Sequence, residues 1–379
     1  MDVDTNRAEL EAWLILLRTP GIGAATLHDL LGRHRHAQAA LAAARRGDLG
    51  RADNDAARAW LRAPDRPRID ADIAWLAMAA HALLTFTDAD FPPLLREIPA
   101  PPAALFVAGD ASALWRPQVA IVGSRHASQG GSANAQAFAH ALVAAGFAIT
   151  SGLAEGIDGA AHAAALDAGG CTIAVLGTGV DIIYPLRHQD LAARIRDHGA
   201  LVSEFPPGTA AHPTHFPRRN RIIAGLGVAT LVVEASPRSG SLITARNSAE
   251  SGREVFAIPG SIHNPLARGC HQLIRQGARL VESADEIIAE LAPLTQGVCA
   301  QLRDRLSAAE ASAGVADAAR TLDPDYASLF AALGHDALGV DQLAQRTALP
   351  VATLSSMLLM LELEGQVVAA GGGAYARRV

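Results

Sequence analysis

Between residues 119 and 281, short apolar runs alternate with segments of helical pattern, and this alternation constrains the fold most. We expect strands at Val119–Gly123, Phe147–Ser151, Thr172–Leu176, Ala200–Glu204, Ala229–Glu234, Glu254–Ile258 and Arg279–Val281. The intervening helices are expected at Ser132–Ala145, Ile157–Ala168, Gln189–Asp197, Asn220–Leu226, Ser241–Ser251 and Cys270–Gln276. Runs that are apolar on both faces are typical of a parallel sheet covered on both sides. The sequence therefore predicts an α/β fold, an extended, doubly wound Rossmann-like domain over residues 80–293, with ligands at the carboxyl ends of its strands.

The first 70 residues predict a small all-α domain, because apolar side chains such as Trp13, Leu16 and Leu27 recur at helical spacing. The segment Leu17–His28 has the form of a helix, a tight Pro-Gly-Ile-Gly turn and a second helix. It is either a helix-hairpin-helix, whose glycines let backbone amides approach a phosphate, or an ordinary corner between helices. The segment Pro64–Pro67 is expected to be a linker.

The C-terminal part divides into a polar, alanine-rich linker at residues 294–322 and a small module at residues 323–379. Three helices are expected at Tyr326–Leu333, Val340–Arg346 and Val351–Leu363, followed by a strand-turn-strand. This is the pattern of a winged helix, whose third helix normally reads duplex DNA. Here that helix has no arginine, so we expect the module to contact protein or support a dimer rather than to bind duplex DNA.

The basic residues limit the chemistry available to the chain. All 32 are arginine, which excludes a Walker-A lysine, a pyridoxal Schiff base and a lysine nucleophile. The net charge is −6, yet nine arginines and only three glutamates lie between His212 and Arg279, so this segment carries +6. A basic island in an acidic chain predicts a localised anionic partner.

The cysteines and the hydropathy of the sequence indicate in which cellular compartment the protein works. The three cysteines are odd in number and far apart in the sequence, which indicates neither a disulfide framework nor a zinc cluster. No apolar run reaches the ~18 residues that a spanning helix needs, and the N-terminus opens acidic rather than basic. We therefore expect a cytoplasmic protein with no membrane partner.

The turn after the first strand reads Gly123-Ser124-Arg125-His126 rather than G-x-G-x-x-G, and the later Gly177-Thr178-Gly179 turn lacks a third glycine. We therefore expect no NAD or FAD and no other cofactor. A Gly-Ser-Arg turn that leads into a helix offers backbone amides, a hydroxyl and a guanidinium, which suit a phosphodiester.

Four further strand ends carry the other motifs: Ser151–His162, Phe216–Leu226, Glu234–Ala245 and Ile258–Ser261. Together with the Gly-Ser-Arg turn, their order and spacing resemble the DprA/Smf family of DNA-processing proteins over roughly His81–Leu291. The resemblance implies a binder of single-stranded DNA that hands incoming DNA to the RecA recombinase during natural transformation. It also implies removal of single-strand binding protein and a homodimer formed through the Rossmann-like domain.

Carried onto this sequence, the resemblance gives a set of expected DNA-binding residues: Gly123, Ser124, Arg125, Ser151, Gly152, Phe216, Arg218, Arg219, Asn220, Arg221, Ser239, Gly240, Ser241 and Thr244. We expect Arg125, Arg219 and Arg221 to contact phosphates, while the serines and the glycine amides add neutral donors. Phe216 either stacks on an unpaired base or belongs to the core. Arg218 either contacts DNA or is a solvated surface residue.

Asp158 and His162 are four residues apart on one expected helix, a spacing that suits a metal or a base and its orienting partner. No third ligand is evident, so we expect a structural role and no metal. Ser239 and Ser241 have no histidine partner in the sequence pattern, and no G-x-S-x-G turn is present. We therefore expect no catalytic residues.

Two other interpretations remain open. Rossmann-like phosphoribohydrolases that cleave nucleoside monophosphates share a similar Gly-Ser-Arg opening, but they carry P-G-G-x-G-T-x-x-E. Here the comparable stretch is Ser236–Thr244, and no glutamate follows at the corresponding spacing. The other alternative is a nucleotide-sensing regulator with a winged-helix output. Release of free adenine from AMP would identify the enzyme.

Overall fold

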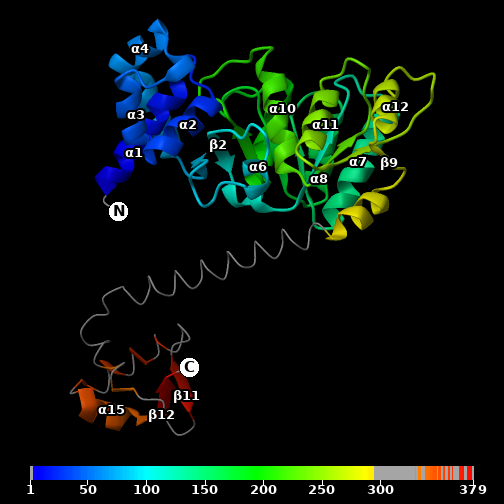
Figure 1. The fold of residues 1–379 in the computed structure, drawn as a ribbon. Coiled ribbons are helices and arrows are strands. Elements are labelled where there is room, and N and C mark those ends of the chain that lie inside the picture. Colours follow the sequence, from blue (N-terminus) through cyan, green and yellow to red (C-terminus); the bar gives the residue numbers. More distant parts are fainter. Residues whose placement is uncertain are drawn as a thin grey trace. The chain divides into compact units, whose positions relative to one another are not determined.

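The computed structural model describes residues 3–293 and, beyond them, 329, 332–333, 338–347, 349–350, 353–354, 357–358, 361, 367–370 and 374–377. The chain forms two compact units, Met1–Ala300 and Gln301–Val379 (Figure 1). The first unit holds the helical domain and the large sheet, and the second holds the small C-terminal module.

The N-terminal part is all-α, as predicted. Its helices are α1 (Val3–Arg18), α2 (Ala24–His34), α3 (Ala37–Arg45), α4 (Asp55–Arg62) and α5 (Arg66–Leu76). The tight turn between α1 and α2 uses Gly21 at φ +81°, a left-handed conformation that favours glycine. A linker was expected at Pro64–Pro67, but α5 begins at Arg66, and Asp65 caps it by accepting a hydrogen bond from the Arg68 amide.

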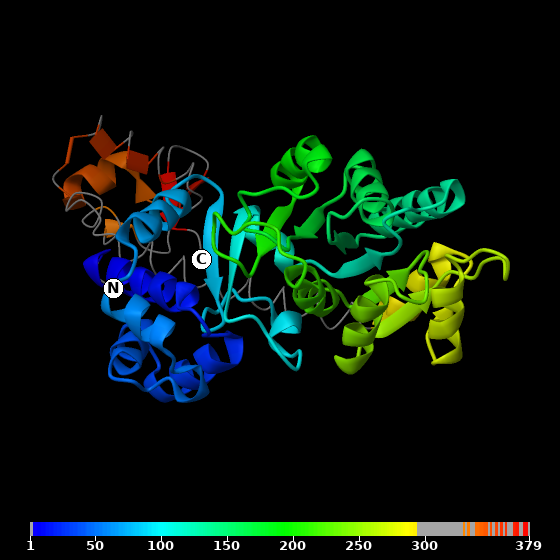
Figure 2. The same ribbon diagram turned by 90° about the horizontal axis from the view of Figure 1, so that it is seen from above.

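Arg18 joins the helical domain to the sheet domain. Its guanidinium pairs with the buried Asp72 and also donates to the Pro207 carbonyl oxygen at 2.8 Å. Phe106 and Val180 of the sheet domain pack in the same apolar cluster as the helices. In Figure 2 the blue helices accordingly lie beside the cyan strands at one end of the sheet.

The sheet has nine strands in the order β1-β2-β6-β5-β4-β3-β7-β8-β9. Their bounds are β1 (His81–Thr85), β2 (Ala104–Gly109), β3 (Gln118–Val122), β4 (Ala148–Ser151), β5 (Thr172–Val175), β6 (Ala200–Ser203), β7 (Ala229–Val232), β8 (Glu254–Ala257) and β9 (Arg279–Leu280). The seven predicted strands are all present, and β3 to β9 pair in parallel. The sequence did not predict β1 and β2, which extend the sheet at one edge, where β2 pairs antiparallel with both β1 and β6.

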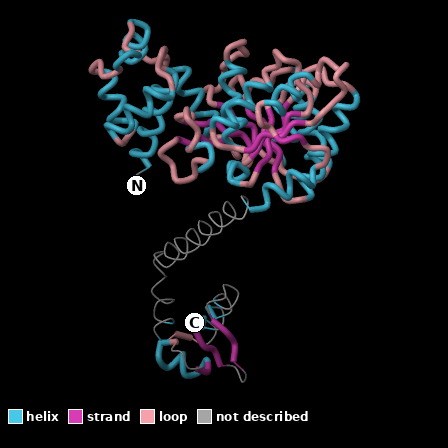
Figure 3. The backbone as a smooth tube through the Cα atoms, turned by 45° about the vertical axis from the view of Figure 1, so that its right-hand side comes forward, coloured by secondary structure: helices cyan, strands magenta, loops and turns pink. Residues whose placement is uncertain are grey.

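Helices cover both faces of the sheet, as Figure 3 shows. One face packs against α7 (Gln129–Ala144), α8 (Ile157–Asp167) and α9 (Gln189–His198). The other face packs against α6 (Pro93–Arg96), α10 (His215–Leu226), α11 (Ser241–Glu250) and α12 (Arg268–Arg275). Because the strands are apolar on both faces, both layers exclude water from the sheet. The predicted doubly wound arrangement is confirmed.

In the second unit, β10 (Leu338–Gly339), β11 (Val367–Ala370) and β12 (Ala374–Arg377) form a sheet beside α15 (Val340–Thr347). The antiparallel β11–β12 pair confirms the expected strand-turn-strand. Leu343, Leu354 and Leu358 belong to its buried core. The expected linker at residues 294–322 lies outside the described residues. Among the described helices of both units, none is long and apolar enough to cross a membrane.

Candidate nucleic-acid interface

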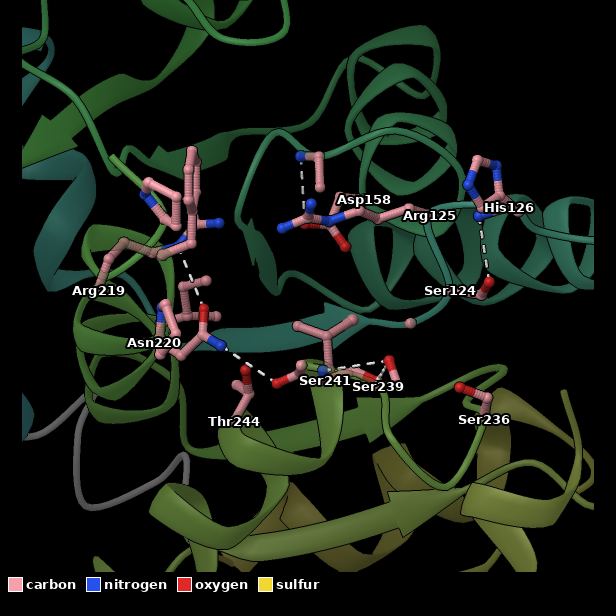
Figure 4. A pocket seen from close by; sticks show the side chains of 18 of the residues that line it. Ser124, Arg125, His126, Asp158, Arg219, Asn220, Ser236, Ser239, Ser241 and Thr244 are labelled. Atoms are coloured by element: carbon pink, nitrogen blue, oxygen red, sulfur yellow. Dashed lines mark hydrogen bonds between the residues drawn. The ribbon is translucent and has the colours of Figure 1, made fainter. Parts of the chain in front are cut away.

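A cavity of about 500 Å³ lies where β3, β4 and β7 end, at the carboxyl edge of the sheet. Ten of the fourteen expected site residues line it: Gly123, Ser124, Arg125, Phe216, Arg219, Asn220, Ser239, Gly240, Ser241 and Thr244. In Figure 4 the side chains from α11 lie along one side and those of the Gly-Ser-Arg turn along another. The parallel topology therefore gathers motifs that are up to 121 positions apart into one site.

The Gly-Ser-Arg turn presents a cation to this cavity. A side chain at Gly123 would approach Ile157 to 2.6 Å and the Glu234 carbonyl oxygen to 2.9 Å, so only glycine fits there. Arg125 is exposed, and no ion pair to its guanidinium is found within the described part of the chain. A guanidinium without a carboxylate partner is available to a phosphate.

Arg218 and Arg221 both pair with Glu204 instead of lining the cavity. Glu204 is only 7% exposed, and it accepts from Arg218 Nε at 3.1 Å and from Arg221 Nη2. Arg221 is 16% exposed, whereas Arg218 remains 47% exposed. Arg221 was expected beside a phosphate, but its guanidinium pairs with Glu204 and the residue does not line the cavity.

Arg219 is part of the cavity wall, but its side chain is turned into the protein and is 4% exposed. Nη1 donates to the Gly152 carbonyl oxygen at 2.7 Å and to the Val175 carbonyl oxygen, and Nε donates to Asn220 Oδ1 at 3.2 Å. Burial lowers its pKa to about 10, although the nearby Asp158 carboxylate opposes that change. Through these contacts Arg219 has a structural role, which the sequence did not predict.

Asp158 and Arg219 hold the loop after β4 from two sides. The Asp158 carboxylate accepts from the Gly152 and Ala154 amides at 3.1 and 3.3 Å, and Arg219 donates to the Gly152 carbonyl. Burial raises the pKa of Asp158. Between these anchors Leu153 has φ +56°, which is a strained value for leucine. Asp158 thus fixes the wall of the cavity.

His162 and Ser151 lie behind the cavity. His162 Nδ1 contacts Thr172 Oγ1 at 2.7 Å, and burial lowers its pKa to about 3. Ser151 is fully buried and donates to the Ile121 carbonyl oxygen at 2.6 Å, so it does not face the cavity. Within the described residues, no group of three or more His, Cys, Asp or Glu side chains is placed to hold a metal ion.

Phe216 is partly exposed and lines the cavity, so it is not a core residue. The guanidinium carbons of Arg125 and Arg219 lie 5.6 and 5.9 Å from its ring centroid. The centroid of the Tyr184 ring lies 5.5 Å from the centroid of the Phe216 ring. Tyr184 comes from the long loop after β5 and was missed in the sequence, because no charged or glycine-rich motif adjoins it.

The beginning of α11 supplies neutral donors. Ser239 and Ser241 contact each other through their hydroxyls at 2.7 Å, and Asn220 Nδ2 donates to the Gly240 carbonyl at 3.2 Å. Amides at a helix N-terminus favour anions. His126 and Ser236 also line the cavity and were not among the expected residues, although both adjoin quoted motifs.

A family profile described as DNA recombination-mediator protein A matches residues 82–292. The chain belongs to this family. Two further profiles of the same group match at the ends: a DprA-like N-terminal HHH domain at residues 7–62 and a DprA winged helix domain at residues 313–373. The helix-hairpin-helix and winged-helix interpretations of the sequence agree with these matches.

Two relatives of this chain align with 81% and 52% of its length. Protein Smf of Escherichia coli (strain K12) is 44% identical over 309 residues, which is 81% of this chain and 80% of the relative. DNA processing protein DprA of Streptococcus pneumoniae is 48% identical over 196 residues, covering 52% of this chain and 69% of the relative.

Two solved structures share the fold. The X-ray structure of DprA from Streptococcus pneumoniae has a TM-score of 0.67 at 37% identity, and the match covers 74% of this chain and 97% of that one. DNA processing protein A from Helicobacter pylori has a TM-score of 0.51 at 26% identity, covering 56% and 96%. The latter was solved for its single-stranded DNA binding mode.

Proposed function

We propose that this chain binds single-stranded DNA at the carboxyl edge of its sheet and acts as a recombination mediator rather than as an enzyme. One observation carries the proposal: the exposed Arg125 guanidinium, without an ion pair among the described residues, shares a cavity with hydroxyl donors and aromatic rings. Arginine and hydroxyl groups suit the phosphates, and aromatic rings suit unpaired bases. The relative from Helicobacter pylori, with its single-stranded DNA binding mode, supports the same ligand.

The proposed role includes three further parts. The chain would protect incoming DNA during natural transformation and load RecA onto it. It would act as a homodimer through the Rossmann-like domain. It would work in the cytoplasm, where separated thiols such as Cys171 and Cys270 stay reduced. Family membership and the sequence support these parts of the proposal, whereas the site described above supports only the contact with DNA.

The decisive experiment compares a single strand of about 16 nucleotides with the matching duplex across a salt series. We expect tighter binding to the single strand, because only unpaired bases can reach an aromatic ring inside a cavity. The affinity should fall linearly with salt on logarithmic axes as counterions are released. Equal affinity for the two substrates, or none for either, would contradict the proposed function.

Replacing Arg125 with alanine is expected to weaken single-strand binding by ~1–3 kcal/mol and to reduce the salt slope by about one phosphate. Anisotropy titrations of a labelled strand in a salt series measure both quantities. Arg194→Ala is the matched control, because that half-exposed arginine pairs with Asp167 and lines no part of the cavity. If Arg125→Ala kept full affinity and an unchanged salt slope, the DNA phosphates would bind elsewhere on the protein.

Ending the chain at Ala300 is expected to leave single-strand affinity within about threefold, because the removed module adds few phosphate contacts. Its expected third helix, Val351–Leu363, contains no arginine. The same titrations, carried out on the shortened and the full chain, test this expectation with single-stranded and duplex DNA. Tight duplex binding that depends on residues 301–379 would show that the winged helix reads DNA.

A further inference from the structure

Two long loops without helices or strands border the cavity, and the structure describes both in full. The β5 loop (residues 176–185) follows β5, and the β6 loop (residues 204–214) joins β6 to α10. The β5 loop carries Tyr184, which lines the cavity and is 50% exposed. The β6 loop leads into Phe216 near the beginning of α10, which lines the cavity as well. The shape of the cavity therefore depends on how these two loops are held.

The two loops are tied to each other by hydrogen bonds. The Asp181 carboxylate accepts from the Gly208 amide at 2.9 Å, and the Gly179 amide donates to the Thr209 carbonyl oxygen at 2.9 Å. A side chain added at Gly179 would approach the Pro206 carbonyl oxygen to 2.7 Å, so the loops lie in direct contact there. A shift of either loop therefore displaces the other.

The β5 loop also supports the ring of Phe216. The Gly177 carbonyl oxygen lies 3.2 Å from His215 Nδ1, and a side chain added at Gly177 would approach the Phe216 ring to 2.9 Å. The His215 ring stacks on Phe205 of the β6 loop, with 4.1 Å between the ring centroids. The position of the loops therefore also sets the position of the Phe216 ring.

The helical domain contacts both loops. Val180 of the β5 loop is 3% exposed and packs in the apolar cluster of the helical domain. Pro207 of the β6 loop is buried, and its carbonyl oxygen accepts from Arg18 Nη2 at 2.8 Å. Neither Val180 nor Arg18 lines the cavity. The helical domain is thus placed to support the site without touching a ligand bound there.

Asp72 fixes the direction of the Arg18 guanidinium. Its carboxylate is 1% exposed and accepts from Arg18 Nε at 2.5 Å and from Nη2 at 2.6 Å, so the ion pair is bidentate. A buried ion pair adds little stability compared with apolar residues of similar size, but a bidentate pair is geometrically specific. Nη2 is therefore held so that its second proton meets the Pro207 carbonyl oxygen.

We propose that Arg18 is a positioning residue for DNA binding, through which the helical domain holds the β5 and β6 loops in the shape that the strand requires. This inference rests on the proposed function, because it explains how the same site is kept ready for its ligand. Loops that already have their binding conformation lose less conformational entropy when a ligand arrives, so the affinity is higher. Arg18 thus contributes to affinity without contacting DNA.

The test replaces the pair with apolar residues, in the variant Arg18→Met/Asp72→Val, so that no buried charge is left unpaired. We expect its free energy of unfolding in urea to stay close to that of wild type. Binding of a single strand of about 16 nucleotides should weaken by about 3- to 30-fold, because the loops are no longer held. The salt slope should not change, since no phosphate contact is lost. Amide hydrogen exchange, measured by mass spectrometry, should become faster in both loops but not in the strands of the sheet.

Glu11→Val/Arg66→Met is the matched control. Glu11 and Arg66 form an ion pair between the same two helices, α1 and α5. Within the described residues, neither side chain makes a hydrogen bond to the sheet domain. This variant should therefore leave unchanged both the affinity for the strand and the hydrogen exchange of the two loops.

Asp181→Ala is a second variant, because Asp181 is exposed and its replacement does not disturb the core. It removes the acceptor for the Gly208 amide and so breaks a link between the two loops. Binding should weaken even though the lost negative charge would by itself favour DNA. Added to Arg18→Met/Asp72→Val, it should cause little further loss, since both changes act through the same loops.

Wild-type affinity in Asp181→Ala, or in a folded Arg18→Met/Asp72→Val, would overturn this inference and leave the proposed function intact. A salt slope reduced by about one phosphate in Arg18→Met/Asp72→Val would also overturn it, because Arg18 would then contact the strand directly. Failure of the wild-type chain to bind the strand at all would instead contradict the proposed function.

Discussion

Replacing Arg219 with alanine is expected to lower the free energy of unfolding by about 3–5 kcal/mol, because each buried hydrogen-bond acceptor left without a donor costs ~1–3 kcal/mol. The change removes the donor for the Gly152 and Val175 carbonyl oxygens and for Asn220 Oδ1. It also leaves the buried Asp158 without the cation that favours its charged form. Unfolding in urea, followed by circular dichroism, measures the loss.

Arg218→Ala is the control for this prediction, since this neighbouring arginine is 47% exposed and its partner Glu204 keeps Arg221 as a second cation. Its removal should change the free energy of unfolding by less than ~1 kcal/mol. The sequence suggested a different role for Arg219, that of a phosphate ligand like Arg125. An Arg219→Ala protein with wild-type stability, weaker DNA binding and a smaller salt slope would restore that role.

Acidification is expected to destabilise the protein through His162, which must remain neutral in the folded state. Burial lowers its pKa to about 3, and the nearby His188 and Arg219 side chains lower this pKa further. An unfolded chain holds histidine at a pKa of about 6.5, so a proton binds the unfolded state first. The stability is therefore complete above pH ~6.5 and declines as the pH falls, by about 4 kcal/mol at pH ~3.

His162→Gln isolates this contribution, because an amide can still donate to Thr172 Oγ1 but does not titrate. Urea unfolding at a series of pH values should show wild type losing stability faster than His162→Gln below pH ~6.5. Asp158 acts in the opposite direction, since its raised pKa favours the folded state on acidification, but it is common to both proteins. Parallel pH curves for the two proteins would contradict the prediction.

The sequence predicted the parallel part of the sheet well because each buried strand shows its own apolar run. It did not reveal β1 and β2, which form the antiparallel edge next to the helical domain. β1 is only partly buried, so its pattern carried a weak signal. The linker expected at Pro64–Pro67 had the composition of a turn, yet a proline in the first turn of a helix fits equally well.

For the arginines of the site, too, the sequence predicted some properties and only the fold showed the others. The sequence marked Arg125, Arg219 and Arg221 as equivalent cations, because it shows their number and spacing but not their partners. In the fold, Arg221 pairs with Glu204 and Arg219 is turned inward, so Arg125 alone of the three is exposed and without a carboxylate partner in the described structure. Such pairings depend on distances between segments that lie far apart in the chain.

By itself, the sequence determined the doubly wound architecture, and it predicted a site at the carboxyl edge of the sheet and an anionic ligand for that site. These properties follow from local hydrophobic patterning and from the polar motifs that close each strand. Only the tertiary structure decided which cation is available, that Asp158 and Arg219 hold the β4–α8 loop, and that Tyr184 rather than Phe216 presents a free aromatic face. Exposure and pairing are properties of the packed chain, because neighbours from other strands and loops bury one side chain and leave another in solvent.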